Sequence, residues 1–161
     1  MDSLRPEDPK VDERYMRLAL NEAQQAAERD EVPVGAIIVA RDRIVGRGHN
    51  LCEQLHDFTA HAEMQAFTAA SESLGGKHLE QCTLYVTLEP CPMCAGAAFW
   101  TRIGRIVYGA SDEKRGFSRW SEGPSTRILH PKTEVLSGIL EEECSDLVKE
   151  FFARKRRKKN G

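Results

Sequence analysis

The sequence predicts a single α/β domain with three layers, in which a mixed five-stranded sheet is covered by helices. Two observations favour this fold class. Helix-like and strand-like segments alternate along the chain, so helical crossovers join some of the strands. The chain has 161 residues, about the size of one domain, and shows no internal repeat or low-complexity linker. We therefore expect one domain over residues 1–161, with a basic tail at residues 154–161.

The first half of the chain is expected to hold two helices and two strands. From Val11 to Arg29 the apolar residues recur every three or four positions, the period of one helix face. The strand-like runs Val32–Ala40 and Arg43–Asn50 are separated by two residues, which predicts an antiparallel hairpin. Gly35 in the first run marks either a close backbone approach by a ligand or a bulge. The segment His61–Leu74 is rich in helix formers and is followed by two glycines, which predicts a helix that ends there.

The second half is expected to hold three strands and two helices. The predicted strands are Thr83–Thr87, Ile103–Tyr108 and Thr133–Leu136. The predicted helices are Cys91–Thr101 and a closing helix from Ile139 to about Lys155. Pro92 fits the first turn of its helix, where a missing N–H leaves no bond unmade. A loop rich in glycine, serine and charged residues separates the last two strands.

The composition is that of a soluble globular protein, with 40% hydrophobic and 30% charged residues. No apolar run approaches the roughly 20 residues of a membrane span. The opening segment, MDSLRPEDPK, mixes acidic residues with prolines and has no apolar core, so it does not have the pattern of a secretory signal. These features predict a cytoplasmic protein that does not associate with a membrane.

Positive charge is concentrated near the C-terminal end of the chain. The net charge is −2, yet Arg154–Lys159 holds six of the 23 basic residues. Without this run, 17 basic residues face 25 acidic ones, a net charge of −8. Such a run is either a solvated end or a surface that contacts phosphates.

The cysteines indicate metal or catalytic use rather than a disulfide framework. There are five, an odd number, in a sequence without secretory features. Cys91 and Cys94 form a C-x-x-C pair, which is typical of metal sites and also of some cytosolic redox sites. At the start of a helix, the positive end of the helix dipole lowers the pKa of such thiols, and this suits Zn²⁺.

His61 and Glu63 supply what a catalytic zinc site needs besides the two thiols. His61 also opens a helix, so the two helix N-termini meet at one sheet edge if the strands before them lie side by side. Zinc with three protein ligands keeps a fourth position for water, whose pKa falls to about 7. A carboxylate that is not a ligand can move a proton from that water to a substrate nitrogen. The pattern H-x-E followed by P-C-x-x-C is typical of zinc nucleobase deaminases.

Several longer segments resemble those of the bacterial tRNA-specific adenosine deaminases, which have a cytidine-deaminase-like fold. They are VPVGAIIV, GRGHN, TAHAEMQA, CTLYVTLEPCPMCAGA, RIGRIVYGASDEKRG and GILEEEC. The resemblance implies that His61, Cys91 and Cys94 bind one zinc ion per subunit and that Glu63 shuttles protons. It implies further that four residues contact the substrate: Asn50 at the purine edge, Pro33 and Val34 against the base, and Asp112 near the sugar.

The implied reaction is the hydrolytic deamination of adenosine to inosine at the wobble position of a tRNA anticodon. The base must be splayed out of a single-stranded loop, because a duplex would hide its C6 atom. The resemblance also implies a homodimer. The basic residues Arg154, Lys155, Arg156 and Arg157 would then contact the backbone of the anticodon stem-loop.

The sequence departs from this family at a few positions and leaves two other functions open. Phe58 stands where a proline is common, and the pair Phe99-Trp100 resembles some deaminases of free guanine. The segment from Phe117 to His130 lacks the residues that are usual in the family. Its Trp120 either stacks on a base or packs at a subunit interface. One alternative is therefore a deaminase of a free base or nucleoside. The other is a structural zinc module that binds RNA, with Cys82 or His130 as the fourth ligand.

Overall fold

The computed structural model describes residues 4–120 and 128–160 and confirms the predicted mixed α/β fold. Five strands form one sheet: β1 (Gly35–Ala40), β2 (Arg43–His49), β3 (Cys82–Leu88), β4 (Arg105–Ala110) and β5 (Glu134–Ser137). The helices in the described residues are α1 (Lys10–Glu28), α2 (Cys52–Leu55), α3 (Ala62–Leu74), α4 (Pro92–Thr101) and α5 (Glu141–Asn160), with a short 3-10 helix, η1 (Phe117–Trp120).

The strand order in the sheet is β2-β1-β3-β4-β5. Strand β1 pairs antiparallel with both β2 and β3, whereas β3 with β4 and β4 with β5 are parallel pairs. The expected meeting of the two helix N-termini depends on β2 and β3 lying side by side. The two strands do not lie side by side, because β1 lies between them. They nevertheless run in the same direction and end at the same edge of the sheet, so the two N-termini still converge.

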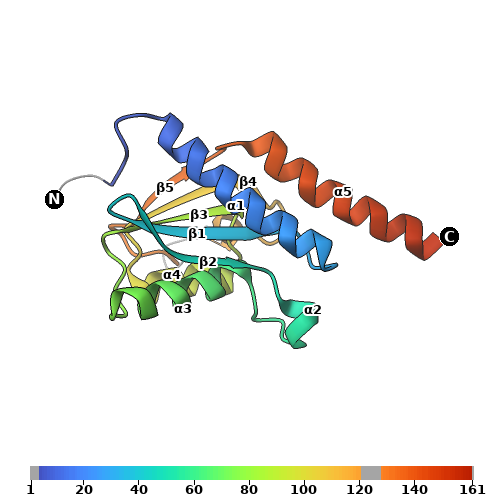
Figure 1. Ribbon diagram of the computed structural model, residues 1–161, viewed down its shortest axis with the longest axis horizontal. Helices are drawn as coiled ribbons and strands as arrows, with labels where there is room; N and C mark the ends of the chain where they lie inside the picture. The colour runs from blue at the N-terminus through green and yellow to red at the C-terminus, as the bar shows by residue number, and fades with distance from the viewer. Residues whose placement is uncertain (1–3, 121–127, 161) are drawn as a thin grey trace.

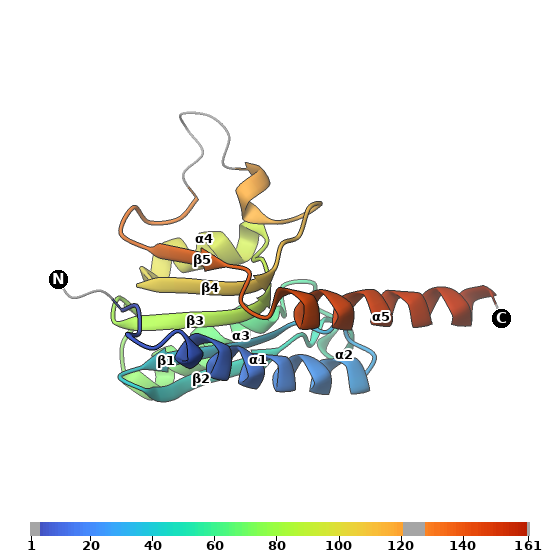
Figure 2. The ribbon, with the colours of Figure 1, turned by 90° about the horizontal axis from the view of Figure 1, so that it is seen from above.

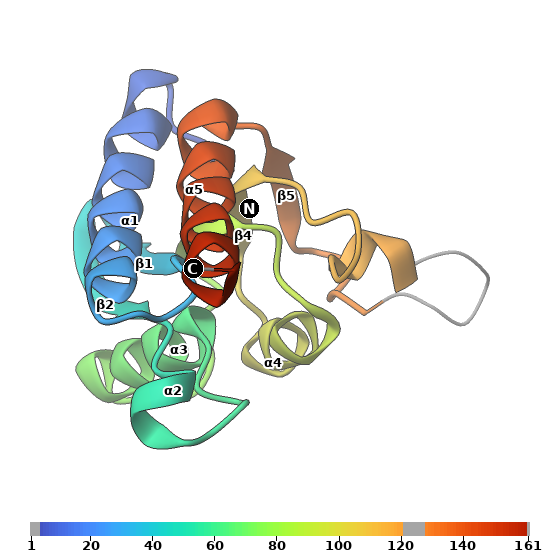
Figure 3. The same cartoon turned by 90° about the vertical axis from the view of Figure 1, so that its right-hand side faces the viewer.

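Helices cover both faces of the sheet, α1 and α5 on one side and α3 and α4 on the other (Figure 1, Figure 3). Successive residues of a strand point to opposite faces, so the sequence IIV of β1 serves both cores. Ile37 is buried with Met16 of α1, and Ile38 with Ala66 of α3. The sheet is thus buried on both faces, which explains why β1, β3 and β4 are almost continuously apolar.

Gly35 is required by helix packing and not by a ligand or a bulge. A Cβ atom built on it would lie 2.0 Å from the backbone oxygen of Ala19 in α1. The irregularity in the β1–β2 pairing lies elsewhere, between Ile38 and Val39. The glycine therefore lets α1 approach β1 closely, just where the chain enters the sheet.

The ends of the predicted elements differ from the observed ones where the backbone is closed by special conformations. Strand β4 begins later than expected because Arg102, with φ 54°, and Ile103 close helix α4. Helix α5 begins at Glu141, after Gly138 and Leu140 with positive φ. It continues to Asn160, past the expected end at about Lys155, so residues 154–160 of the expected basic tail are helical. Lysine and arginine are good helix formers and are stabilised at the negative C-terminal end of the helix dipole.

None of the helices in the described parts of the chain is long and apolar enough to cross a lipid bilayer.

A buried ion pair fastens α1 to the sheet. Both oxygens of Asp12 accept hydrogen bonds from the Arg105 guanidinium, at 2.8 and 2.7 Å, and Tyr85 donates to the same carboxylate at 2.7 Å. Burial favours a higher pKa for Asp12, but the bonds from Arg105 and Tyr85 outweigh it and hold the pKa below its usual range. The carboxylate therefore stays ionised when the protein is folded.

Replacing Asp12 by Asn should leave the buried Arg105 charge without its partner. We expect the free energy of unfolding, measured in urea at pH 7, to fall by about 3–5 kcal/mol. The control is Glu13→Gln, which removes an exposed carboxylate of the same helix and should change stability by no more than about 0.5 kcal/mol.

The same carboxylate makes stability depend on acid. Because its pKa is lowered by folding, its contribution is complete above the ordinary Asp pKa of about 4 and is lost as the pH falls through the lower pKa of the folded state. The wild-type protein should therefore lose more stability between pH 5 and pH 2 than Asp12→Asn does. Equal losses in the two proteins would contradict this account.

Candidate active site

The predicted metal ligands lie at the starts of two helices that begin at one edge of the sheet. His61 is the N-cap residue of α3, and Cys91 is the N-cap residue of α4, with Pro92 in the first turn. Both N-caps have extended backbone, so the chain turns sharply from the preceding segment into the helix. Cys94 follows one turn into α4. The two positive helix ends thus face a common point.

The three donor atoms are close enough together to share one metal ion. Nδ1 of His61 lies 3.6 Å from Sγ of Cys91 and 3.5 Å from Sγ of Cys94, and all three atoms lie within 4.8 Å of one another. A tetrahedral zinc ion with ordinary Zn–S and Zn–N bonds separates a nitrogen and a sulfur ligand by about 3.6 Å. The chemistry and spacing of the donor set therefore fit zinc.

The electrostatics of the cluster favour a thiolate at Cys91. A hydrogen bond from Cys94, together with one from His61, lowers the pKa of Cys91 to about 4 against the opposing effect of burial. The hydrogen bond to Cys91 raises the pKa of His61, and the bond to Cys91 and burial raise the pKa of Cys94. The cluster thus holds protons that a bound cation would displace, as thiol and imidazole sites do.

Glu63 lies in the first turn of α3 and is buried beside the three ligands. Only 4% of its surface is exposed, and this burial raises the pKa of its carboxyl group to about 7. It does not belong to the group of three ligand residues. A carboxyl group that titrates near neutral pH can both accept and donate a proton under working conditions.

No fourth protein ligand completes the cluster among the His, Cys, Asp and Glu residues at positions 4–120 and 128–160. Cys82 begins β3, at the end of the strand remote from Cys91. The ring of His130 instead lies 6.2 Å from that of Phe99, near the other end of α4. The structure therefore gives no support to a closed zinc module built from Cys82 or His130.

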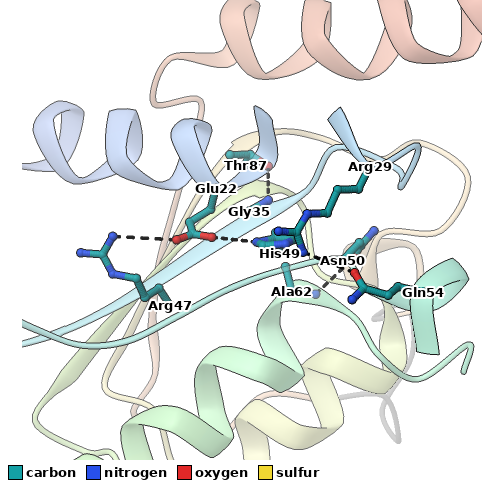
Figure 4. A network of polar contacts seen from close by, with 9 residues as sticks. All are labelled: Glu22, Arg29, Gly35, Arg47, His49, Asn50, Gln54, Ala62 and Thr87. Carbon is teal, nitrogen blue, oxygen red and sulfur yellow. Dashed lines mark hydrogen bonds and ion pairs between the residues drawn. The ribbon is translucent and has the colours of Figure 1, made fainter. Parts of the chain in front are cut away.

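Asn50 supports the helix that carries His61. Its side-chain oxygen accepts the N–H of Ala62 at 2.9 Å, which satisfies one of the free donors of the α3 N-terminus (Figure 4). Its backbone N–H donates to the carbonyl of Val34 at 3.2 Å. The oxygen is thus already used, and the donor that remains for a ligand is the Nδ2 amide. Contact with a purine stays a prediction.

The other predicted substrate residues are held by their surroundings in different ways. Pro33 and Val34 are buried before β1, and Val34 packs into the core on the α3 side, as the bare sequence suggests. One oxygen of Asp112 accepts the N–H groups of Lys114 and Arg115, so Asp112 also stabilises a surface turn. Their contacts with a base or a sugar remain predictions.

The basic residues lie in the last turns of α5. This helix extends beyond the sheet at the end of the molecule where α2 also lies (Figure 1, Figure 2). Lys155 is engaged within the chain, because its Nζ lies 2.6 Å from a carboxylate oxygen of Asp30. Both Lys155 and Arg154 also approach the ring of Phe151. Arg156 and Arg157, by contrast, are exposed.

The aromatic residues that depart from the family pattern are mostly exposed. Trp100 is 79% exposed, Phe58 90% and Trp120 60%, whereas Phe99 is 37% exposed and makes an edge contact with Trp100. The helix aromatics are therefore not core residues. Residues 121–127, part of the segment that differs from the family, lie outside the described residues.

Sequence reasoning missed two buried carboxylates, Glu31 and Glu89, each two residues before a predicted site residue. Glu31 accepts the N–H groups of Glu53 and Gln54 at the start of α2, at 2.9 and 2.8 Å. Glu89, two residues before Cys91, accepts two N–H groups from the loop that follows β4. Glutamate is rarely buried, so sequence alone assigns it to the surface. The only hint was that each precedes an apolar run containing proline.

A third polar cluster lies on the α1 side of β2 (Figure 4). A carboxylate oxygen of Glu22 lies 2.8 Å from Nδ1 of His49, and its other oxygen pairs with Arg47 at 3.8 Å. Beside it, the N–H of Gly35 donates to the hydroxyl of Thr87 at 3.1 Å. These contacts hold β2 against α1 immediately before Asn50.

An imidazole and two thiols with the spacing of zinc ligands, and a buried carboxyl group beside them on a three-layer α/β fold, are typical of zinc-dependent deaminases. Comparison with known proteins agrees with this class. Residues 9–110, which include all four of these side chains, match the family described as the cytidine and deoxycytidylate deaminase zinc-binding region.

Individual relatives narrow the assignment. The chain is 46% identical over 153 residues to the tRNA-specific adenosine deaminase of Bacillus subtilis (strain 168), with 92% of each chain covered. It is 44% identical over 146 residues to that of Agrobacterium fabrum (strain C58), covering 88% of this chain and 94% of the relative. The chain therefore belongs to the cytidine and deoxycytidylate deaminase zinc-binding family, among the tRNA-specific adenosine deaminases.

Solved structures support the same fold. One from a study of A-to-I editing by tRNA:A34 deaminases at the wobble position of transfer RNA superposes with a TM-score of 0.76 and 43% identity, over 83% of this chain and 98% of the other. The guanine deaminase of Bacillus subtilis has a TM-score of 0.61 and 31% identity, over 73% of this chain and 82% of the other.

Glu63→Ala tests whether proton transfer and metal binding depend on different side chains. We expect zinc content and melting temperature to persist while deamination falls by about 10²–10⁴-fold, the usual contribution of a general acid–base group. Zinc is measured per chain by atomic spectroscopy, and turnover by ammonia release. Glu72→Ala, an exposed change in the same helix, should keep full activity. Turnover retained in Glu63→Ala would refute the proton-shuttle role.

Proposed function

We propose that this protein hydrolyses adenosine to inosine at the wobble position of a tRNA anticodon. The observation that carries the proposal is the cluster of His61, Cys91 and Cys94 with the buried carboxyl group of Glu63 beside it. The relatives that match the chain over most of its length are tRNA-specific adenosine deaminases, which supports tRNA as the substrate.

The proposed reaction assigns the metal and the proton transfer to different side chains. His61, Cys91 and Cys94 would hold zinc, which when bound supplies Lewis-acid chemistry and lowers the pKa of water to about 7. Glu63 takes the proton of the attacking water and delivers it to the amino nitrogen on C6 of adenine. A C6–O bond forms, the C6–N bond breaks, and ammonia leaves.

The surroundings of the site are suited to a base that has left its stack. A nucleotide in a single-stranded anticodon loop can bring C6 to the cluster at little energetic cost, whereas a paired one cannot. In our proposal the Nδ2 amide of Asn50 donates to the purine edge, since its oxygen is held by Ala62. Pro33 and Val34 form the apolar wall against the base, and Asp112 accepts the ribose hydroxyl.

We assign RNA backbone contact chiefly to the basic end of α5. Arg156 and Arg157 are exposed on the part of the helix that extends beyond the body (Figure 2). Arg154 and Lys155 serve the same surface, although the ammonium of Lys155 also pairs with Asp30. We further propose a homodimer with one zinc ion per subunit, active in the cytoplasm.

A deaminase of free guanine is the second candidate, favoured by the likeness to the guanine deaminase of Bacillus subtilis. Incubation of the zinc-loaded protein with an adenosine-bearing anticodon stem-loop, free adenosine and free guanine separates the candidates. We expect inosine from the stem-loop, identified by mass spectrometry after nuclease digestion, and a much lower rate on the two small molecules. Turnover of guanine alone would overturn the proposal.

Neutralising the exposed arginines tests the role of the α5 end. For Arg156→Gln/Arg157→Gln we expect KM for the stem-loop to rise severalfold and the slope of log(1/KM) against log[salt] to become shallower by about one to two, because fewer counterions are released. The control, Lys77→Gln, changes an exposed lysine just after α3 and should leave both quantities unchanged. A double variant with the wild-type KM and salt slope would remove RNA contact by α5 from the proposal.

A further inference from the structure

Glu89 is a buried charge that the proposed reaction does not use. It follows the last residue of β3 and is 4% exposed. One of its oxygens accepts the N–H of Asp112 at 3.1 Å, and the other accepts the N–H of Ser118 at 3.0 Å. The partners of this buried carboxylate are thus two backbone groups of the loop at residues 111–118, 23 and 29 positions further along the chain.

The backbone joins the loop to the same place. The N–H of Glu89 donates to the carbonyl of Ala110 at 2.8 Å, and the N–H of Phe117 donates to the carbonyl of Pro90 at 2.8 Å. Both ends of the loop are therefore attached to the two residues that directly precede the ligand Cys91. The loop cannot move relative to the metal ligands without breaking these bonds.

Gly116 makes room for the carboxylate. A Cβ atom built on this residue would lie 2.3–2.4 Å from the carboxyl atoms of Glu89, which is closer than any real contact. The loop is closed internally by the bond from the N–H of Gly116 to the carbonyl of Asp112 at 2.9 Å. With the carboxylate in this position, a side chain at residue 116 would force Glu89 or the loop to move.

A buried carboxylate is stable only when strong hydrogen bonds replace its lost hydration, and bonds to an ionised acceptor are about twice as strong as neutral ones. If residue 89 only had to continue the strand, a neutral side chain would do so without the desolvation cost of a carboxylate. Its two bonds instead fix one segment, and that segment adjoins the start of α4. A polynucleotide that brings one base to the cluster must place the groups flanking that base against the residues around Cys91.

We propose that Glu89 is a positioning residue for the polynucleotide substrate. Its carboxylate fixes the loop at residues 111–118 beside the zinc ligands, so that the loop meets the flanking part of the substrate in a preset geometry. The effect is on substrate binding, whereas proton transfer remains with Glu63. The inference rests on the proposed action on an RNA loop.

Two independent substitutions remove the same contact. Glu89→Gln places an amide where one of the two N–H donors needs an acceptor, and Gly116→Ala pushes the carboxylate away from the loop side. The matched controls are Glu80→Gln, on a half-exposed glutamate, and Gly76→Ala, where an added Cβ meets nothing within 4 Å. Each protein is first checked for zinc per chain, circular dichroism and melting temperature.

The direct readout is amide hydrogen exchange at Asp112 and Ser118, which does not depend on activity. We expect protection to fall by roughly tenfold or more at both amides in Gly116→Ala and at one or both of them in Glu89→Gln, as for the loss of charge-assisted bonds. The kinetic readout is the stem-loop reaction, with KM raised about tenfold and kcat changed less than about threefold. The KM of the double variant should be no higher than that of the more impaired single variant, because both substitutions break the same contact.

Three outcomes would each overturn the inference. They are unchanged protection at both amides, an unchanged KM in a folded Gly116→Ala protein, and effects on KM that multiply in the double variant. A loss of kcat with unchanged KM would also overturn it, since it would assign Glu89 to the chemistry. If Glu89→Gln fails to fold, Gly116→Ala alone decides. A wild-type protein that does not act on the stem-loop refutes the proposed function itself, and this differs from a variant that fails beside an active wild type.

Discussion

The site depends on the direction of a single strand. Because β1 runs opposite to both of its neighbours, β2 and β3 end at the same edge of the sheet although they do not touch. Helices α3 and α4 begin near that edge, and their N-cap residues, His61 and Cys91, bring a nitrogen and a sulfur within 3.6 Å. Two helix N-termini meeting at one point also supply the positive field that two thiolates require. A slip of one residue in either pairing would move each side chain of the shifted strand to the opposite face of the sheet and would separate the ligands.

Much of this arrangement could be predicted from the sequence because its signals are local. The alternation of helical and strand-like periods predicted the fold class, and the two residues between the first strands predicted the hairpin. The spacing of Cys91 and Cys94, with Pro92 between them, predicted a helix N-terminus with two thiols. The position of Glu63 beside the ligands follows from its distance of two residues from His61. In each case the residues that interact are neighbours along the chain or share one well-known pattern.

What sequence reasoning missed depends on partners remote in the chain. Asp12 and Arg105 are 93 positions apart, and the backbone groups that satisfy Glu31 and Glu89 lie more than 20 positions away. A carboxylate in a sequence carries no mark of the backbone groups that will surround it. The helices α2 and η1 have four residues each, too few to show a period. The helical state of the last basic residues was missed because a run of like charges resembles a disordered tail, whereas α5 extends it from a folded base.

The charge pattern of α5 has a consequence for how a partner arrives. The helix starts with Glu141, Glu142 and Glu143 and ends with Arg157, Lys158 and Lys159, while the chain without its basic run carries a net charge of −8. The molecule is thus an electric dipole with its positive pole on a projecting arm. In such a field a polyanion is turned during diffusion so that it reaches the arm first, and other approaches are repelled. Productive collisions are therefore selected by orientation before any close contact forms, and ions in the solvent weaken that selection.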